Sequence, residues 1–316
     1  MSSSSNVVNY SLRQNKSIER SIVFDCARAI VDRLHLSDMV YVGFGSVWFS
    51  DFHQAHRHLD IETMVSIESD DIMYSRAVYN RPYRTVEVLK GNSDEVLPEL
   101  LARDELRYRP WMVWLDYDKI IDETKLQELG DLITNLPPDS FLITTFSASG
   151  GRYGGPASRP ERLRQLFGDA APEGLDLDEY KDEALARLLA QSMQDFLLSK
   201  AQQYARLGSY VPAFRLTYKD GTPMVTVGGF LPSPGNQAEA TAATTDATWV
   251  GVLDNTINTP PLTPKESLAL QEALPVGSSV LTREDVRAMG FDLEDEQVDA
   301  FQRHYLRYPR FSQLTR

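Results

Sequence analysis

The chain contains little of what an exported or membrane-embedded protein needs. Its single cysteine, Cys26, cannot form a disulfide within the chain. No apolar run approaches the roughly 18 residues of a membrane-spanning helix. The opening MSSSSNVVNY has neither the basic nor the apolar region of a signal peptide. These absences predict a cytoplasmic protein that does not interact with a membrane.

Positive charge is also scarce. The 316 residues include 32 Lys and Arg against 45 Asp and Glu, which gives a formal net charge of -13 and a pI near 4.9. Bulk binding of nucleic acid is therefore not expected, because it depends on cationic side chains that neutralise phosphates. Arg152, Arg159, Arg162 and Arg164 cluster after a Gly-rich stretch, where they form either a local basic patch or a solvated loop.

The first half of the chain alternates between two periodicities. Five short apolar runs with strand patterning are separated by segments with helical spacing, beginning with a helix over 22–34. Strands that alternate with helices predict a doubly wound, mostly parallel sheet with right-handed crossovers. The predicted strands cover residues 39–44, 63–69, 85–91, 110–118 and 140–148.

The second half completes one large α/β domain with an appendage. A Gly- and Pro-rich loop leads into a long amphipathic helix near 178–207, and two alternating runs around Lys219-Asp-Gly221 predict an antiparallel hairpin. Helix-cap candidates, Thr263 among them, predict two or three short helices in the tail. The expected organisation is an N-terminal helical segment (1–35), an α/β domain (36–232) with a helical insertion (about 151–210), a flexible loop (233–261) and a helical C-terminal extension (262–316).

The first predicted strand ends in Gly43-Phe-Gly45 and leads directly into a helix, as in nucleotide-binding loops. In a dinucleotide fingerprint the third glycine lets helix and strand pack closely around a pyrophosphate. Trp48 occupies that position here, so a pyrophosphate cofactor bound in the usual way is disfavoured. A ligand without pyrophosphate needs only a close backbone approach, which glycines permit, and a plain tight turn is the alternative.

Polar side chains follow the next predicted strands at the point where each strand ends. Glu68 lies at the separation of roughly twenty residues that a ribose-binding acid shows after the glycines; a surface acid at a strand end is the alternative. Open α/β sheets bind ligands at the carboxyl ends of their strands. The polar groups there are Glu68, Ser69, Asn92, Ser93, Asp116, Asp118 and Lys119.

These segments together resemble the successive motifs of class I S-adenosylmethionine-dependent methyltransferases, most closely a prokaryotic O-methyltransferase-like branch. The resemblance covers about residues 10–150, and the hairpin fits the antiparallel pair that ends this Rossmann-like sheet. It implies that the glycines contact the methionine part of the cofactor, Glu68 the ribose, Asn92 and Ser93 the adenine, and that Asp116 lies near the amino group or the substrate. The predicted cofactor-binding residues are Gly43, Gly45, Ser46, Glu68, Ser69, Asn92, Ser93 and Asp116.

The chain departs from the family pattern at two places. The family has an acid two residues before the first glycine, where this chain has Tyr41. Metal-dependent members place an Asp-Asn pair after the fifth strand, where this chain has Thr144-Thr-Phe-Ser147. One or two carboxylates without further oxygen ligands hold magnesium poorly, so no required metal is predicted.

Methyl transfer from a sulfonium is an in-line displacement, so a protein mainly positions the reactants and removes a proton. Asp116 and Asp118 are the base candidates, and Lys119 is a further catalytic candidate or an ion-pair partner. Trp48, Tyr117 and Trp114 could contact a sulfonium by cation–π attraction or belong to the core.

Two further clusters have ordinary explanations beside functional ones. His53, His56 and His58 could suggest zinc, but no HExxH motif or cysteine partner accompanies them, so exposed helix histidines are expected. The basic residues over 12–20 precede the first predicted helix and are expected either to be solvated or to cover a cofactor.

The sequence therefore predicts an S-adenosylmethionine-dependent methyltransferase that transfers to an oxygen of an unidentified small or macromolecular acceptor. Two alternatives stay open: a non-catalytic nucleotide-binding or scaffold protein with the same fold, and an RNA or protein methyltransferase that acts within a complex. A homo-oligomer or a partner protein is left open as well.

Overall fold

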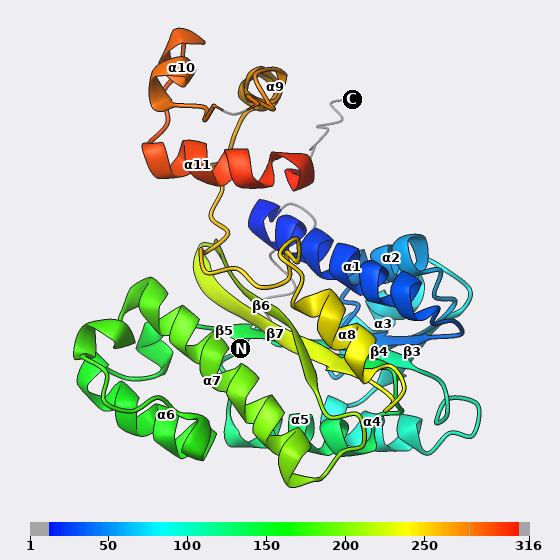
Figure 1. Cartoon of the computed structure of the whole chain (residues 1–316). Coiled ribbons are helices and arrows are strands. Elements are labelled where there is room, and N and C mark those ends of the chain that lie inside the picture. The colour runs from blue at the N-terminus through cyan, green and yellow to red at the C-terminus, as the bar shows by residue number, and fades with distance from the viewer. Residues whose placement is uncertain (1–12, 278, 310–316) are drawn as a thin grey trace.

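A single seven-stranded sheet forms the centre of the molecule. The computed structural model describes residues 13–277 and 279–309, and its strands run in the order β3-β2-β1-β4-β5-β7-β6 (Figure 1). β1 to β5 are parallel, and β7 pairs antiparallel with both β5 and β6. The strands are β1 Val40–Gly43, β2 Thr63–Glu68, β3 Val86–Lys90, β4 Trp111–Asp116, β5 Ser140–Ser147, β6 Val211–Asp220 and β7 Thr222–Leu231. The predicted Rossmann-like sheet with a terminal hairpin is confirmed.

Helices cover both faces of this sheet, and each face has its own core (Figure 1). Along β4, Trp111, Val113 and Leu115 join one core, while Met112 and Trp114 join the other. Successive side chains of a strand point to opposite faces, so a strand covered on both faces has an uninterrupted apolar sequence. One face carries α1 Gln14–Leu34, α2 Ser50–Leu59, α3 Asp71–Asn80 and α8 Gln237–Thr244. The other carries α4 Ser93–Leu101, α5 Glu123–Asn135, α6 Arg159–Phe167 and α7 Asp182–Gln203.

The first helix differs from the prediction. α1 begins at Gln14, eight residues before the predicted start, and Lys16, Glu19 and Arg20 within it are buried. The expectation that the basic residues of this segment are solvated is therefore wrong for Lys16 and Arg20. The backbone amides of Asn15 and Lys16 donate hydrogen bonds to the carboxylate of Asp220 on β6, at 3.1 and 2.8 Å. This distant carboxylate satisfies amide groups that the first turn of a helix otherwise leaves unpaired.

The segment expected to be a flexible loop also contains ordered structure. Helix α8 lies within it and buries Ala240 and Ala243, and isolated bridges join Arg215 to Val252 and Tyr218 to Ile257. Alanine has high helix propensity but contributes little to an apolar pattern, so composition alone did not predict this helix.

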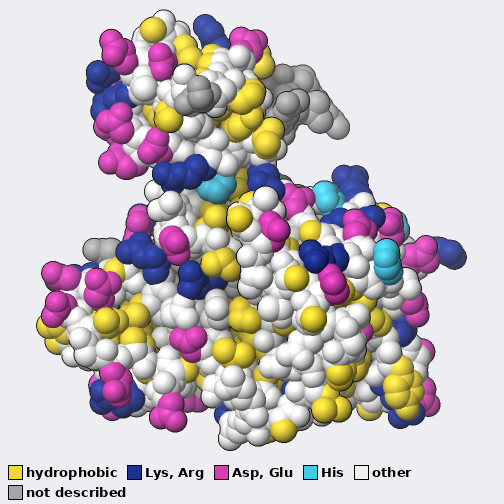
Figure 2. Space-filling model, in the orientation of Figure 1, with side chains coloured by type: hydrophobic (Ala, Val, Ile, Leu, Met, Phe, Trp, Pro, Cys, Tyr) yellow, Lys and Arg dark blue, Asp and Glu magenta, His cyan; other side chains and the backbone are white. Residues whose placement is uncertain are grey.

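The insertion and the C-terminal extension are helical, as expected. Short 3-10 helices (η3 Gly150–Arg152, η4 Pro156–Ser158, η5 Gly168–Ala170, η6 Leu177–Tyr180) accompany α6 and α7 in the insertion, and the extension holds α9 Pro264–Glu272, α10 Arg283–Ala288, α11 Asp295–His304 and η7 Tyr305–Arg307. Thr263 caps α9 and Thr282 caps α10. The extension forms a lobe beside the domain (Figure 2), and the side chain of Arg307 pairs with Asp25 of α1 at 2.9 Å, which joins the two.

Within the described residues, no helix is both long and apolar enough to cross a membrane.

Candidate functional site

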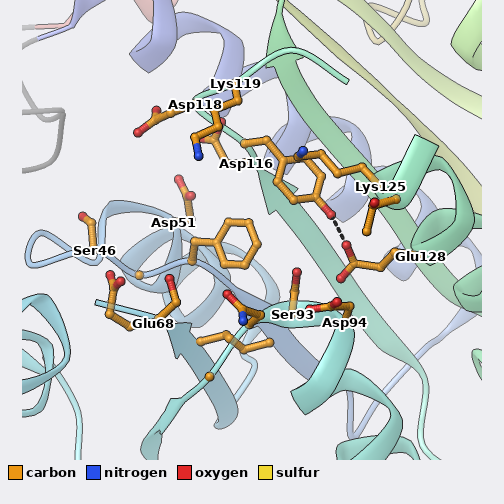
Figure 3. Close-up of a pocket in the computed structure, with 18 of the residues that line it drawn as sticks. Ser46, Asp51, Glu68, Ser93, Asp94, Asp116, Asp118, Lys119, Lys125 and Glu128 are labelled. Atoms are coloured by element: carbon orange, nitrogen blue, oxygen red, sulfur yellow. Dashed lines mark hydrogen bonds between the residues drawn. The ribbon is translucent and has the colours of Figure 1, made fainter. Parts of the chain in front are cut away.

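A cavity of about 500 Å³ opens at the carboxyl ends of the parallel strands (Figure 3). It lies at the loops that follow β1 to β4, which is where open α/β sheets bind ligands. The structure brings most of the predicted site residues together around it. Those that line the cavity are Gly45, Ser46, Glu68, Ser69, Asn92, Ser93, Asp116, Asp118 and Lys119.

Gly43 is the exception among the predicted cofactor-binding residues, because it does not line the cavity. A Cβ atom at this position would lie 3.1 Å from both the Trp114 carbonyl oxygen and the Tyr41 hydroxyl. Gly43 therefore allows β1 to pack against β4 and Tyr41, and its role in the structure is packing.

Gly45 lies at a much tighter point of the same loop. Its amide donates a hydrogen bond to Ser66 Oγ at 3.1 Å, and an added Cβ would come within 2.5 Å of the Phe49 ring and 2.6 Å of Ser66 Oγ. Ser46 and Phe49 both have φ of 49°, a left-handed conformation that non-glycine residues adopt rarely. The loop thus turns sharply at the cavity wall and needs glycine at position 45.

The ends of β2 and β3 form the next part of the wall. Glu68 Oε1 accepts a hydrogen bond from the Asp70 amide at 3.0 Å, and burial raises the pKa of the Glu68 carboxyl. Asn92 is the N-cap of α4, and the side chain of Glu95 accepts a hydrogen bond from the Asn92 backbone amide in a capping box. The amino end of α4, with its partial positive charge, therefore borders the cavity beside Asn92 and Ser93.

The opposite end of the cavity contains Glu128, which was not predicted from the sequence. Tyr117 donates a hydrogen bond to Glu128 Oε2 at 2.6 Å (Figure 3), and burial raises the pKa of both groups. Glu128 Oε1 is buried without a hydrogen-bond partner in the described structure. The sequence does contain a sign of this burial, because Glu128 lies four residues before the buried Leu132, on the apolar side of α5.

An ion pair joins Asp116, in the cavity wall, to Lys16 of α1. Lys16 Nζ lies 2.8 Å from Asp116 Oδ2 and 3.4 Å from Glu19 Oε2, and it stands 4.8 Å from the centre of the Trp114 ring. Burial alone would lower the pKa of Lys16, but the two carboxylates outweigh it and hold the pKa well above its usual range. With one ammonium between two acids, burial raises the pKa of Glu19 to about 7.

A second buried ion pair reaches the cavity directly. Arg20 of α1 donates from Nε to Asp51 Oδ1 of α2, and both residues line the cavity beside Ser46 and Ser50. Asp51 was not predicted as part of the site, and Arg20 was considered only among the basic residues over 12–20, which were expected either to be solvated or to cover a cofactor. Arg20 sits in a helical stretch whose charges suggest solvent exposure, and only its distant partner explains its burial.

The predicted aromatic contacts are mostly absent from the cavity. Trp114 is buried in the core, Trp48 is 41% exposed, and neither lines the cavity, whereas Tyr117 does.

The remaining candidate clusters have local partners. His53 Nδ1 contacts the Tyr83 hydroxyl and His56 Nδ1 the Ile61 carbonyl, each at 3.0 Å. The described residues contain no group of three or more His, Cys, Asp or Glu placed to hold a metal. In the arginine cluster, Arg159 donates to the Gly154 and Tyr180 carbonyls and Arg162 pairs with Glu123.

The raised pKa of Glu19 predicts a pH-dependent stability. Between the ordinary pKa of 4.5 and about 7, the folded state holds a proton that the unfolded state releases, so this contribution is complete below pH 4.5 and is lost as pH rises through 7. Glu19→Gln should remove the loss. Relative to the unmodified protein, its unfolding free energy in urea should rise by about 2 to 3 kcal/mol between pH 5 and pH 8. Glu99→Gln, an exposed acid on α4, is the control, and identical pH profiles for both variants would contradict the assignment.

Comparison with known proteins identifies the family. The model of the family described as "Putative O-methyltransferase" matches residues 8–316. No curated protein matches the chain.

Among solved structures, Trm1 from Pyrococcus horikoshii in complex with S-adenosyl-L-methionine is 12% identical, with a TM-score of 0.44 over 71% of this chain and 57% of that chain. The chain thus matches little more than half the length of Trm1. The O-methyltransferase TomG from Streptomyces achromogenes is 14% identical, with a TM-score of 0.37 over 72% of this chain and 93% of that chain. Cofactor-bound Rv0187 from MTB is 15% identical, with a TM-score of 0.40 over 72% of this chain and 83% of that chain.

The assignment rests on the family model, which covers nearly the whole chain, and the observed sheet agrees with it. The chain belongs to the "Putative O-methyltransferase" family.

Proposed function

We propose that the cavity at the carboxyl ends of β1 to β4 binds S-adenosylmethionine and that the protein transfers the cofactor's methyl group to an oxygen atom of its acceptor. The observation that supports this most directly is the convergence of the glycine turn, the β2 carboxylate and the capped start of α4 on one cavity. When bound, S-adenosylmethionine supplies a methyl group activated by a sulfonium.

The size and charge of the cavity suit this cofactor. Its volume of about 500 Å³ lies within the range of roughly 300 to 1,000 Å³ that small-molecule sites occupy. Carboxylates outnumber cationic side chains along the wall, and a cleft lined by one sign of charge attracts ligands of the other. The acids are Asp51, Glu68, Asp94, Asp116, Asp118 and Glu128, and the cationic residues are Arg20, Lys119 and Lys125.

The elements divide the cavity into parts with different chemistry. One carboxylate oxygen of Glu68 accepts a hydrogen bond from a backbone amide. The carboxylate faces the cavity near Ser46 (Figure 3), where it can accept hydrogen bonds from vicinal ribose hydroxyls. Asn92, Ser93 and the Tyr117 ring surround the space beyond it, which suits the flat adenine.

The groups at the end of β4 and just after it are the candidates for removing a proton from an acceptor hydroxyl. Asp116 is engaged by Lys16 at 2.8 Å, so it serves mainly to position its neighbours. Asp118 is exposed at the cavity wall beside Lys119, and both lie on the same side of the cavity as Asp116 (Figure 3). Asp118 is therefore our base candidate, with Lys119 as the group that stabilises the resulting alkoxide.

Oxygen is proposed as the accepting atom on sequence grounds. The motif Asp116-Tyr-Asp-Lys119 follows the O-methyltransferase-like pattern, and the chain lacks an Asn-Pro-Pro-Tyr motif suited to exocyclic amines. Transfer to RNA is less well supported, because Arg159 and Arg162 already have partners within the protein.

A cytoplasmic location and catalysis without a required metal are part of the same proposal. They rest on the composition and on residues Thr144 to Ser147, which form the end of β5. The acceptor can be a small molecule or a macromolecule.

Glu68→Gln should weaken binding of S-adenosylhomocysteine by about 10- to 100-fold, because hydrogen bonds to a charged acceptor are replaced by weaker ones. Isothermal titration calorimetry measures the affinity directly. Glu62→Gln, an exposed acid just before β2, should bind as the unmodified protein does. Equal affinity for both variants would exclude Glu68 as the ribose ligand.

Gly45→Val should abolish detectable binding of S-adenosylhomocysteine, because its side chain would enter the space of Phe49 and Ser66. A thermal-shift assay should show no stabilisation of this variant by the ligand, in contrast to the shift that binding gives the unmodified protein. At Gly151 an added Cβ meets nothing within 4 Å, so Gly151→Ala is the control. A normal ligand-induced shift in Gly45→Val would place the cofactor elsewhere.

Asp118→Asn should lower methyl transfer by about 100-fold or more, the contribution of a general base, while cofactor affinity stays unchanged. The measurement follows radiolabel from the methyl group of S-adenosylmethionine into components of a cell extract, and it also tests the function itself. Asp131→Asn, an exposed acid on α5, is the control. An undiminished rate would remove Asp118 from the chemistry, and no transfer by any variant, with the cofactor bound, would favour the non-catalytic alternative.

A further inference from the structure

The family pattern leaves the amino-acid end of the cofactor without an obvious anchor in this chain. We propose that Arg20 and Asp51 bind that end, with Arg20 contacting the carboxylate of the methionine part and Asp51 its ammonium. This inference rests on the proposed function, because it assigns a part of the cofactor to a part of the same cavity.

Both residues are buried and yet line the cavity. Arg20 is 6% exposed and Asp51 is 8% exposed, and they belong to different helices, α1 and α2. Figure 3 shows Asp51 projecting into the cavity between Ser46 and Asp116. Polar groups this deeply buried have little access to bulk water, so they serve either each other or a ligand.

The ion pair leaves part of each partner available. Arg20 uses Nε for its hydrogen bond to Asp51 Oδ1, and the structure gives its Nη groups no hydrogen bond to another described residue. A guanidinium presents five N–H donors and matches a carboxylate with two parallel hydrogen bonds. The second oxygen of Asp51 can likewise accept from an ammonium. A ligand that carries both charges on one carbon matches this pair of opposite charges.

The groups that would otherwise hold the ammonium are occupied or absent. Tyr41 stands where the family has an acid, and it is fully buried outside the cavity wall. Asp116, the second candidate, already pairs with Lys16 at 2.8 Å. Glu68 is assigned to the ribose, so Asp51, which lines the cavity together with Gly45 and Ser46, is the acid that takes the role.

The position of Arg20 is fixed before any ligand arrives. The start of α1 is held by Asp220 of β6, and Asn15 Nδ2 donates to the Lys219 carbonyl at 2.8 Å. A guanidinium held by a rigid helix loses little freedom on binding, and such preorganisation strengthens binding.

Three probes separate the two contacts: S-adenosylhomocysteine, its analogue without the carboxylate (S-adenosyl-3-thiopropylamine), and 5′-methylthioadenosine, which lacks both groups. By calorimetry, Arg20→Lys should weaken S-adenosylhomocysteine by about 10- to 100-fold and leave the other two within about 3-fold. Asp51→Asn should weaken both ammonium-bearing ligands and spare 5′-methylthioadenosine. Arg28→Lys, on the exposed side of α1 and paired with Asp32, should change none of the affinities.

Retained binding of 5′-methylthioadenosine shows that a variant is folded, and the Arg20→Lys comparison decides the question even if Asp51→Asn does not fold. If Arg20→Lys weakens all three ligands equally, or weakens none, the pair is purely structural and this inference is overturned while the cofactor pocket stands. If the unmodified protein binds none of the three, the proposed function fails, and this inference fails with it.

Discussion

The ion pair between Lys16 and Asp116 is the contact on which the site depends. An ammonium this deeply buried is costly unless carboxylates surround it, and Asp116 and Glu19 supply them. The pair joins the first helix to the end of β4, the central strand of the seven-stranded sheet. Removing Asp116 would leave the buried Lys16 ammonium with Glu19 alone, and removing Lys16 would leave two carboxylates without their shared cation. The helix therefore cannot leave the sheet without a large loss of stability.

The same helix gives the cavity part of its chemistry. Arg20 lies four residues after Lys16, about one helical turn, so both side chains lie on one face of α1. Lys16 fixes that face beneath β4, and Arg20 then reaches the cavity beside the glycine turn. The strands alone would give the cavity an excess of carboxylates. The helix adds Arg20 as a fixed cation. The region around Arg20 and Asp51 therefore suits a zwitterion, and the rest of the cavity, where acids predominate, suits a cation.

Sequence patterns predicted the features that depend on neighbouring residues. The strands, the hairpin and the polar strand ends follow from local periodicity and from the geometry of a parallel sheet, and Glu68, Asn92 and Asp116 line one cavity as that geometry requires. The start of α1 could not be predicted in this way, because its partners lie far away in the sequence. Asp220 accepts from its first backbone amides, and Thr226 and Asp116 contact its buried charged side chains. The placement of Gly43 likewise depends on a neighbouring strand.

The second half of the chain supports the site through α1. The hairpin holds the first turn of the helix through Asp220 and reaches Glu19 through the Thr226 hydroxyl, which donates to Glu19 Oε1 at 2.5 Å. From the other side, the C-terminal extension contacts the helix through the Arg307–Asp25 pair and through the Tyr308 hydroxyl, which lies 3.2 Å from Gln14 Oε1. The extension does not line the cavity, yet it is attached to the helix that carries Arg20.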